Sequence, residues 1–351
     1  MTDRIVTLTY GAEAYAYAFT ERAAESGAPV RHTARFSTRD GATGHAVSPA
    51  LDRVAYAAGG ELVCADRDGT ELWRYPLRTG DQDGTYLSGG PSCAFSPDGR
   101  TLWLYRQGPM VPVPRGESPE MDRRLDRNPH LKRGTDRLLA LDAADGTVLA
   151  EAVLGSSGHG ALVRPHPDGE HVLVGVMEGQ DGGRNFRARL EDGGLDLHTY
   201  GTYGYLDDLS PSGRVFLVGD ESGITLHSFP DGEELGGFGL DAFDHDGDDF
   251  ETLFLGMHLA AFLDEDRVVV SVHGERAVPE PEEDDEDEDD EDDEDDGQDL
   301  DFRENHVVEA ATGRVLGPLP GQSRHHERLV VIGDGSWLSI DGAERPRRHT
   351  L

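Results

Sequence analysis

The sequence contains almost no lysine and almost no cysteine. Lysine occurs once, at Lys132, so arginine supplies nearly all of the positive charge, and cysteine occurs only at Cys64 and Cys93. Both cysteines lie in short apolar, strand-like runs, which predicts two buried thiols and not a disulfide or redox pair. The preference for arginine, together with 45 glycines, indicates the codon usage of a GC-rich, actinobacterial genome.

Long apolar runs and helical periodicity are also missing. No stretch approaches the roughly 18 apolar residues of a membrane-spanning helix. Residues 1–19 carry an acid and an arginine near their start and have no unbroken apolar core, so they do not resemble a signal peptide. Only residues 21–25 suggest a helical turn. We therefore expect a soluble, cytoplasmic, all-β protein.

The balance of charge excludes two classes of partner. The formal net charge is −37, and residues 280–301 hold 18 acids and no base, including fifteen consecutive acids at 282–296. Subtracting these 18 charges leaves −19 for the rest of the chain. Such a surface repels phosphate backbones and anionic lipids, so we expect no nucleic-acid and no membrane partner.

What the chain does contain is a repeat. Seven short, β-branched or aromatic runs recur, and apart from two insertions their spacing is about 40 to 50 residues, the period of propeller blades. Near-continuous apolarity predicts strands covered on both faces, as the middle strands of stacked blades are. The runs open at Arg4, Arg53, Arg100, Glu170, Arg214, Arg267 and Arg328.

Two kinds of turn accompany the runs. Before the run comes Ser-Pro-Asp-Gly at residues 96–99, with variants at 166–169 and 210–213. Proline presets φ, the aspartate bonds to the backbone and glycine accepts a positive φ, so each segment is a hairpin turn. A second turn, for example residues 144–146, follows the run. The unit is therefore a four-stranded antiparallel meander.

These segments resemble known propeller repeats. SCAFSPDGRTLWLY at residues 92–105 and LLALDAADGTVL at 138–149 resemble WD40-like repeats, and ADRDGTELWRYPL at 65–77 resembles quinoprotein-like repeats. No Trp-Asp pair closes a repeat, so the hydrogen-bond network of WD40 repeats does not carry over. The resemblance implies a β-propeller but little about function, because propellers serve as scaffolds, enzymes and binders.

We therefore predict an all-β fold in which residues 1–351 form a single β-propeller of four-stranded blades. Seven runs favour seven blades, with six as the alternative. The first run has no room for a leading strand, so we expect the C-terminal stretch RPRRHTL, residues 345–351, to close the ring. Closure by both chain ends removes exposed strand edges.

Two insertions interrupt the connection between second and third strands, so they should emerge on the same face. Residues 108–136 contain five prolines and predict an extended, semi-rigid loop. Residues 279–301 are too charged to bury surface and predict disorder. Either insertion could be only a solvated loop, or the two could pair weakly over the channel. The candidate interaction residues are Arg115, Arg123, Arg124, Arg127, Lys132 and Arg133 in the first, and Glu282, Glu283, Asp284 and Asp285 in the second.

Motifs for catalysis are weak. Residues 155–159, GSSGH, come close to a nucleophile elbow but lack its final glycine and its helix. The acidic loop at 241–251 fails calcium-loop spacing. His258, His273 and His325 could approach each other near the channel, but no metal-ligand spacing exists. We expect no catalytic residue, no cofactor and no metal site.

The sequence therefore favours a monomeric, non-catalytic scaffold that binds a protein partner through one loop-decorated face. One alternative is an enzyme that holds a metal or a quinone-type cofactor in the central channel. Another is a sensor of a small ligand.

Overall fold

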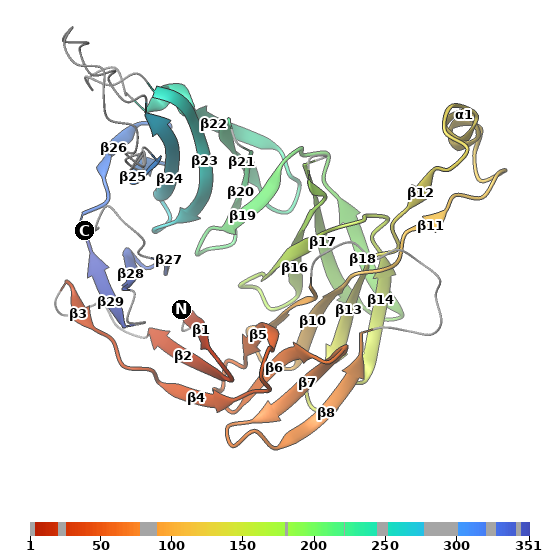
Figure 1. Ribbon diagram of the computed structural model, residues 1–351, viewed down its shortest axis with the longest axis horizontal. Helices are drawn as coiled ribbons and strands as arrows, with labels where there is room; N and C mark the ends of the chain where they lie inside the picture. The colour runs from red at the N-terminus through yellow and green to blue at the C-terminus, as the bar shows by residue number, and fades with distance from the viewer. Residues whose placement is uncertain are drawn as a thin grey trace, which may run out of the picture.

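The computed structural model describes residues 4–19, 26–77, 90–179, 182–220, 222–243, 252–276, 301–320, 328–341 and 345–351. In these residues seven small antiparallel sheets stand as blades around a central axis (Figure 1). The predictions of an all-β fold and of seven blades are confirmed, and the six-blade alternative is wrong.

Five blades are four-stranded meanders built from consecutive strands. In each blade the strands are given from the axis outward. One blade contains β5 (Thr43–Val47), β6 (Arg53–Ala58), β7 (Glu61–Asp66) and β8 (Glu71–Pro76), and the next contains β9 (Ser92–Phe95), β10 (Thr101–Arg106), β13 (Arg137–Asp142) and β14 (Val148–Val153). The third contains β15 (Gly160–Pro165), β16 (His171–Met177), β17 (Gly183–Glu191) and β18 (Gly194–Thr199). The next two contain β19 (Tyr205–Leu209), β20 (Val215–Gly219), β21 (Gly223–Ser228) and β22 (Glu234–Gly239), followed by the 3-10 turn η2 (Leu240–Ala242); and β23 (Thr252–Phe262), β24 (Arg267–Arg276), β25 (Asp301–Glu309) and β26 (Val315–Pro318).

Both ends of the chain close the ring. The last blade contains β27 (Arg328–Val331), β28 (Ser336–Ile340) and β29 (Pro346–Thr350), and its outer strand is the N-terminal segment β3 (Ala28–Pro29). Both chain ends meet in this blade, as predicted, but the C-terminal stretch is its third strand and does not supply the leading strand that the first blade lacks.

The first blade is incomplete in the described residues. It has three strands, β1 (Arg4–Tyr10), β2 (Glu13–Phe19) and β4 (Ala34–Ser37). Strand β1 contacts β5 of the following blade, as the second strands β10 and β16 contact the first strands that follow them. Strand β1 therefore takes a second-strand position, and no described residue supplies a first strand.

One of the seven runs was assigned to the wrong strand. The run at Arg328 is β27, the first strand of its blade, and the buried second strand is β28, all of whose residues are buried. The apolar pattern does not reveal β28 because two of its five residues are serines. They are buried because they are bonded: Ser336 Oγ accepts from Arg348 Nε at 2.9 Å, and Ser339 Oγ lies 2.9 Å from His349 Nε2.

Apolar side chains from neighbouring blades pack against one another. Cys64 of β7 lies in one cluster with Leu102 and Leu104 of the next blade, and all three are fully buried. Trp73 joins the cluster, and its indole N–H donates to the Ala143 carbonyl across the blade boundary at 3.1 Å. Each buried leucine contributes roughly 1.5–3 kcal/mol. Five of the seven runs, those at Arg53, Arg100, Glu170, Arg214 and Arg267, are covered on both faces as predicted, whereas β1 and β27 are only partly buried.

The predicted hairpin turns join first to second strands. In the turn at residues 96–99, Ser96 Oγ donates to Asp98 Oδ1 at 2.6 Å, the Arg100 N–H donates to the same oxygen at 3.0 Å, and Gly99 has φ 70°. In an antiparallel meander these turns and the third-to-fourth turns emerge at one end of the blades, which we call the turn face. The second-to-third connections emerge at the other end, which we call the arm face.

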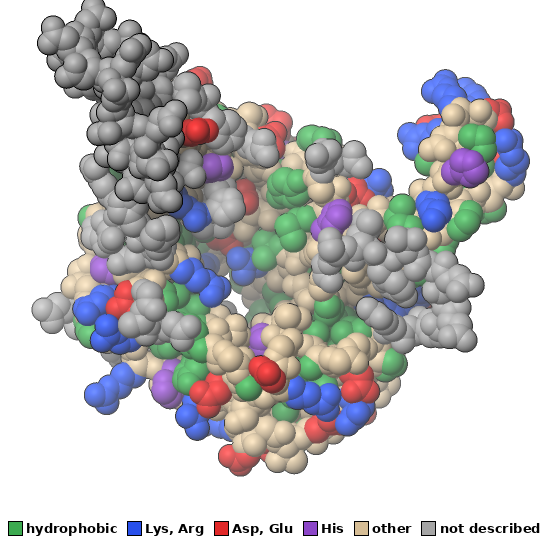
Figure 2. Space-filling view, viewed as in Figure 1, with side chains coloured by type: hydrophobic (Ala, Val, Ile, Leu, Met, Phe, Trp, Pro, Cys, Tyr) green, Lys and Arg blue, Asp and Glu red, His purple; other side chains and the backbone are tan. Residues whose placement is uncertain are grey.

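The insertion at residues 108–136, here called the basic arm, differs from the extended loop that we predicted. It is a short ribbon, β11 (Val111–Pro112) with β12 (Lys132–Arg133), capped by helix α1 (Pro119–Arg127). In Figures 1 and 2 the arm projects outward from the ring and away from the channel. No helix in the described residues is long and apolar enough to span a membrane.

Candidate interaction site

Helix α1 forms because its sequence carries helix signals at both ends. Ser118 is the N-cap, and its Oγ accepts from the Met121 N–H at 3.1 Å, while Pro119 occupies the first turn. Acids lie in the first turn and arginines in the last, which suits the helix dipole. Leu125 of α1 is 3% exposed and Val113 beside the ribbon is also buried, so the arm has a small apolar centre.

The base of the arm is fixed by one buried carboxylate, Asp136. Its Oδ2 accepts from Tyr105 Oη at 2.8 Å, from Ser156 Oγ at 3.1 Å and from the Gly158 N–H at 2.7 Å. Its Oδ1 accepts from the Gly108 N–H at 2.9 Å. Burial raises the pKa of Asp136, whereas these donors act in the opposite direction. The network ties both ends of the arm to Tyr105 of its own blade and to the connection between β14 and β15.

All six predicted basic residues of the arm are exposed. Three of them are paired within the arm: Arg115 with Asp126 at 2.9 Å, Arg124 with Glu120 at 3.8 Å, and Arg133 with Glu117. Exposed pairs of this kind are worth about 0–1 kcal/mol each.

The remaining bases are Arg123, Arg127 and Lys132. In the described parts of the chain, none of the three forms an ion pair with a carboxylate; Arg123 Nε instead donates to the Pro119 carbonyl. Figure 2 shows the arm as a projection ringed by basic side chains. The structure therefore brings the six predicted residues together on one folded element, and three of them offer uncompensated charge.

The acidic half of the prediction cannot be placed. Glu282, Glu283, Asp284 and Asp285 lie outside the described residues. They lie between β24 and β25, the second and third strands of their blade, whose flanking ends are at the arm face. The described arm does not extend over the channel (Figure 1), which removes the basic half of the predicted closure.

The channel carries a small charged group on inner strands. Arg164 Nε of β15 lies 3.6 Å from Asp208 Oδ1 of β19, and Asp208 Oδ2 accepts from the Phe262 N–H at 3.0 Å. Beside it, Asp207 occupies a bulge in β19. Burial, and then the charge of Asp208, raises the pKa of Asp207 to about 7. Sequence analysis missed this residue, although two adjacent acids in an apolar strand were the available signal.

The structure explains the motif at residues 155–159, whereas the acidic loop and two of the histidines lie wholly or partly outside the described residues. Ser156 is buried and donates to Asp136, so residues 155–159 close the arm's base. Most of the acidic loop at 241–251 lies outside the described residues, as do His325 and the side chain of His258. The possible approach of His258, His273 and His325 near the channel therefore falls outside the described residues.

Comparisons with known proteins establish the fold alone. No family model and no curated protein matches the chain. The β-propeller domain of Cps50 (Swd1) from Myceliophteria thermophila is 11% identical with a TM-score of 0.54, covering 99% of this chain and 100% of that one. BamB from Moraxella catarrhalis is 12% identical with a TM-score of 0.46, covering 100% and 82%, a likeness too low to support an argument. The chain is a seven-bladed β-propeller.

Proposed function

We propose that this protein is a non-catalytic scaffold that binds a protein partner through its arm face, with the basic arm as the principal contact. The observation that carries the proposal is a folded, anchored arm with three exposed bases, Arg123, Arg127 and Lys132, that form no ion pair with a carboxylate among the described residues. A bristle that only keeps the protein soluble needs neither a helix nor a buried anchor such as Asp136.

Charge indicates the chemistry of the partner. With a net charge of −37, this protein repels an acidic partner almost everywhere except at the arm. An acidic segment on the partner would meet the arm in one orientation, and exposed charges of this kind govern association rate and specificity more than affinity. The acidic run, including Glu282, Glu283, Asp284 and Asp285, is proposed as a second contact, for a basic part of the same partner.

We also propose a cytoplasmic, monomeric protein. Cys64 and Cys93 are both free and buried, and burial raises the pKa of each thiol to about 12, which agrees with a compartment in which cysteines stay reduced.

A second candidate function is binding of a small ligand or a cofactor in the channel. It is favoured by the Arg164–Asp208 pair on the innermost strands β15 and β19, and by the raised pKa of the neighbouring Asp207, whose carboxyl lies beside Gly219 of β20. Metal analysis, an absorbance spectrum and a thermal-shift screen of the purified protein would separate this function from the scaffold.

The scaffold proposal is tested by quantitative affinity capture from the native host. The test variant reverses the three uncompensated charges, Arg123→Glu, Arg127→Glu and Lys132→Glu. The matched control makes the same change in net charge on the turn face, at Arg100, Arg214 and Arg314, whose side chains are 68–84% exposed. We expect the arm variant to lose specific partners and the control to keep them. Equal loss in both variants would contradict a role for the arm.

A further inference from the structure

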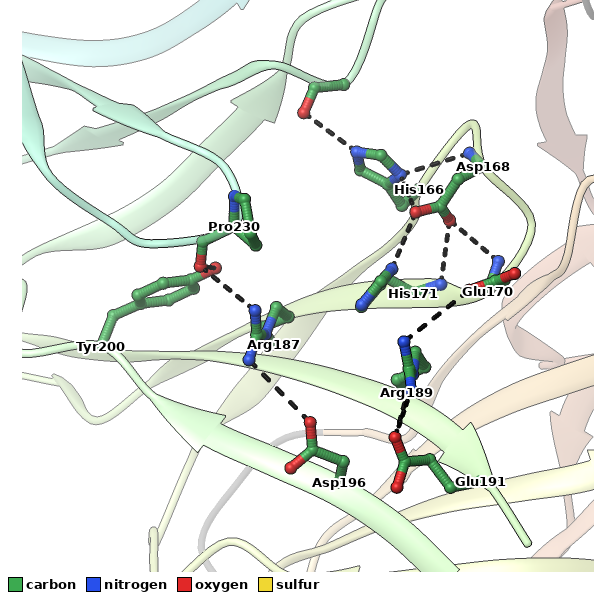
Figure 3. Close-up of polar contacts among 11 residues, drawn as sticks. His166, Asp168, Glu170, His171, Arg187, Arg189, Glu191, Asp196, Tyr200 and Pro230 are labelled. Carbon is green, nitrogen blue, oxygen red and sulfur yellow. Dashed lines mark hydrogen bonds and ion pairs between the residues drawn. The ribbon is translucent and has the colours of Figure 1, made fainter.

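The turn between β15 and β16 differs from its counterparts in chemistry. This turn, His166-Pro167-Asp168-Gly169, lies on the turn face, at the opposite end of the blades from the basic arm. The equivalent turn between β9 and β10 has serine where this one has His166, and threonine where this one has His171. Two imidazoles therefore flank the turn aspartate here (Figure 3).

The three side chains converge on one point. Asp168 Oδ2 lies 2.9 Å from His166 Nδ1 and 2.7 Å from His171 Nδ1. One ligand atom from each residue falls within 4.8 Å of the other two. Imidazole nitrogen and carboxylate oxygen are ligand types that Zn²⁺ accepts, and three protein ligands plus water form an open site. Asp168 is about one-third exposed, which leaves water access.

A second contact fixes which nitrogen of His166 is available. His166 Nε2 lies 2.9 Å from the Gly213 carbonyl oxygen of the next blade, which can only accept, so Nε2 carries a hydrogen. The Nδ1 of the neutral ring then holds a lone pair, which accepts from the Asp168 backbone N–H at 3.2 Å and which a metal ion would take over on binding. Phe229 stacks on the ring with centroids 4.1 Å apart and holds its orientation. A metal-ligating histidine is usually fixed in this way by a backbone carbonyl on its second nitrogen.

Charge balance gives an independent reason. Comparable turn aspartates are neutralised by arginine: Asp98 by Arg100 at 2.6 Å, and Asp264 by Arg267. At the position of Arg100, this turn carries Glu170. The Asp168 carboxylate thus faces two imidazoles without an arginine.

The two oxygens of the carboxylate have different partners. Asp168 Oδ1 accepts from the backbone N–H groups of Glu170 at 2.8 Å and His171 at 3.0 Å, whereas Oδ2 faces the two imidazoles. Arg189 is paired with Glu191 and lies 3.9 Å from Glu170 (Figure 3), and in the described residues no arginine forms an ion pair with Asp168. A cation bound by Oδ2 and by the imidazole nitrogens would stabilise this arrangement.

We propose that His166, Asp168 and His171 form a binding site for a late first-row divalent cation of the Zn²⁺ class. The ion is bound by His166 Nδ1, an Asp168 oxygen and a His171 nitrogen, and water completes its coordination. Bonds of about 2.0–2.2 Å require ligand atoms roughly 3.3 Å apart, so the side chains open by a few tenths of an ångström on binding. Because His166 and Gly213 belong to neighbouring blades, the ion would stabilise that blade boundary.

The experiment titrates the full-length, chelator-treated protein with Zn²⁺ against a chromophoric competitor, and with Co²⁺ followed by visible absorption. Weak binding to the acidic run gives no intense tetrahedral Co²⁺ bands, whereas a site with two histidines does. The variants are His171→Gln and Asp168→Asn, and the matched control is Asp98→Asn in the equivalent turn. Melting temperatures without metal verify that each variant is folded.

We expect one tight equivalent of Zn²⁺ and tetrahedral Co²⁺ bands in the wild type and in Asp98→Asn. Affinity should fall at least tenfold in both His171→Gln and Asp168→Asn, and Zn²⁺ should raise the melting temperature of the wild type but not of these two variants. No Zn²⁺ binding beyond that of the variants, or unchanged affinity in folded His171→Gln, would overturn the proposal. Either result would mean that hydrogen bonds alone hold the three side chains of this turn together.

Discussion

The boundary between the β15–β18 blade and the β19–β22 blade offers a sharp test of how blades hold each other. Gly213 and Gly169 occupy the same position in equivalent turns and have nearly the same φ, 79° and 78°. A Cβ added at Gly169 meets nothing within 4 Å, whereas one at Gly213 would lie 2.2 Å from His166 Nε2. Alanine at either position incurs the cost of a left-handed backbone, about 1–2 kcal/mol. Only alanine at Gly213 must also displace a ring.

The additional cost follows from the contacts of that ring. Displacing His166 loses its hydrogen bond to Gly213, about 1 kcal/mol, and its stacking on Phe229, about 0.5–1.5 kcal/mol. We therefore expect Gly213→Ala to lower the free energy of unfolding by about 3–4 kcal/mol, and Gly169→Ala by about 1–2 kcal/mol. Guanidinium denaturation of both variants measures the difference.

A double-mutant cycle completes the test. In a His166→Ala background the clash is absent, so Gly213→Ala should cost no more than Gly169→Ala does in the wild type. If the two glycine variants lose equal stability in the wild-type background, His166 does not bridge the two blades as described, and the reasoning is refuted.

Three further predictions follow from buried groups. The folded pKa of Asp207 is about 7 and its ordinary value is 3.8, so the wild-type protein loses stability as the pH rises from about 4 to 7. Asp207→Asn should therefore stabilise the protein little near pH 4 and increasingly toward pH 8, by at most roughly 4 kcal/mol. A gain in melting temperature that does not change with pH would refute this. Asp136→Asn keeps one oxygen for the three donors at the Oδ2 position, but it turns an amide nitrogen toward the Gly108 N–H and weakens the remaining hydrogen bonds by removing the charge. Chemical denaturation should show a loss of about 1–3 kcal/mol, and a loss below about 0.5 kcal/mol would contradict the anchoring network. Cys64 and Cys93, with a pKa of about 12 each, should resist a thiol reagent at pH 8 in the native protein and yield two equivalents in denaturant; rapid native labelling would be inconsistent with their burial.

The repeat made the fold predictable from sequence because each blade restates the same pattern. Turns such as residues 96–99 indicate a hairpin, and the apolar run after each turn indicates a buried strand. The pattern failed at the ring closure. Strand β28 is buried through hydrogen-bonded serines, and the two-residue strand β3 gains its place only by pairing with β29, a contact between segments more than 300 residues apart. The local sequence of neither segment indicates that the two strands pair.

The candidate site was predictable in part. Clustering of the six bases followed from their proximity in sequence, but helix α1 was missed because five prolines suggested an extended chain. The signal was present: Ser118 before Pro119, acids next and arginines last. Asp136 and the Gly213–His166 contact depend on tertiary packing, so only the three-dimensional structure reveals them. The sequence analysis did not single out His166, Asp168 and His171, because only the turn geometry brings their ligand atoms together.

The most direct test of the central claim, that the arm is the recognition element, is site-specific photo-crosslinking in cells of the native host. A photoreactive residue would replace His130, which is exposed between α1 and β12, and in a parallel strain Arg100 on the turn face. We predict a few dominant protein adducts from His130 that disappear when Arg123, Arg127 and Lys132 are reversed to glutamate, and none of these adducts from Arg100. Adducts from Arg100 alone, or adducts from His130 that survive the charge reversal, would contradict the claim.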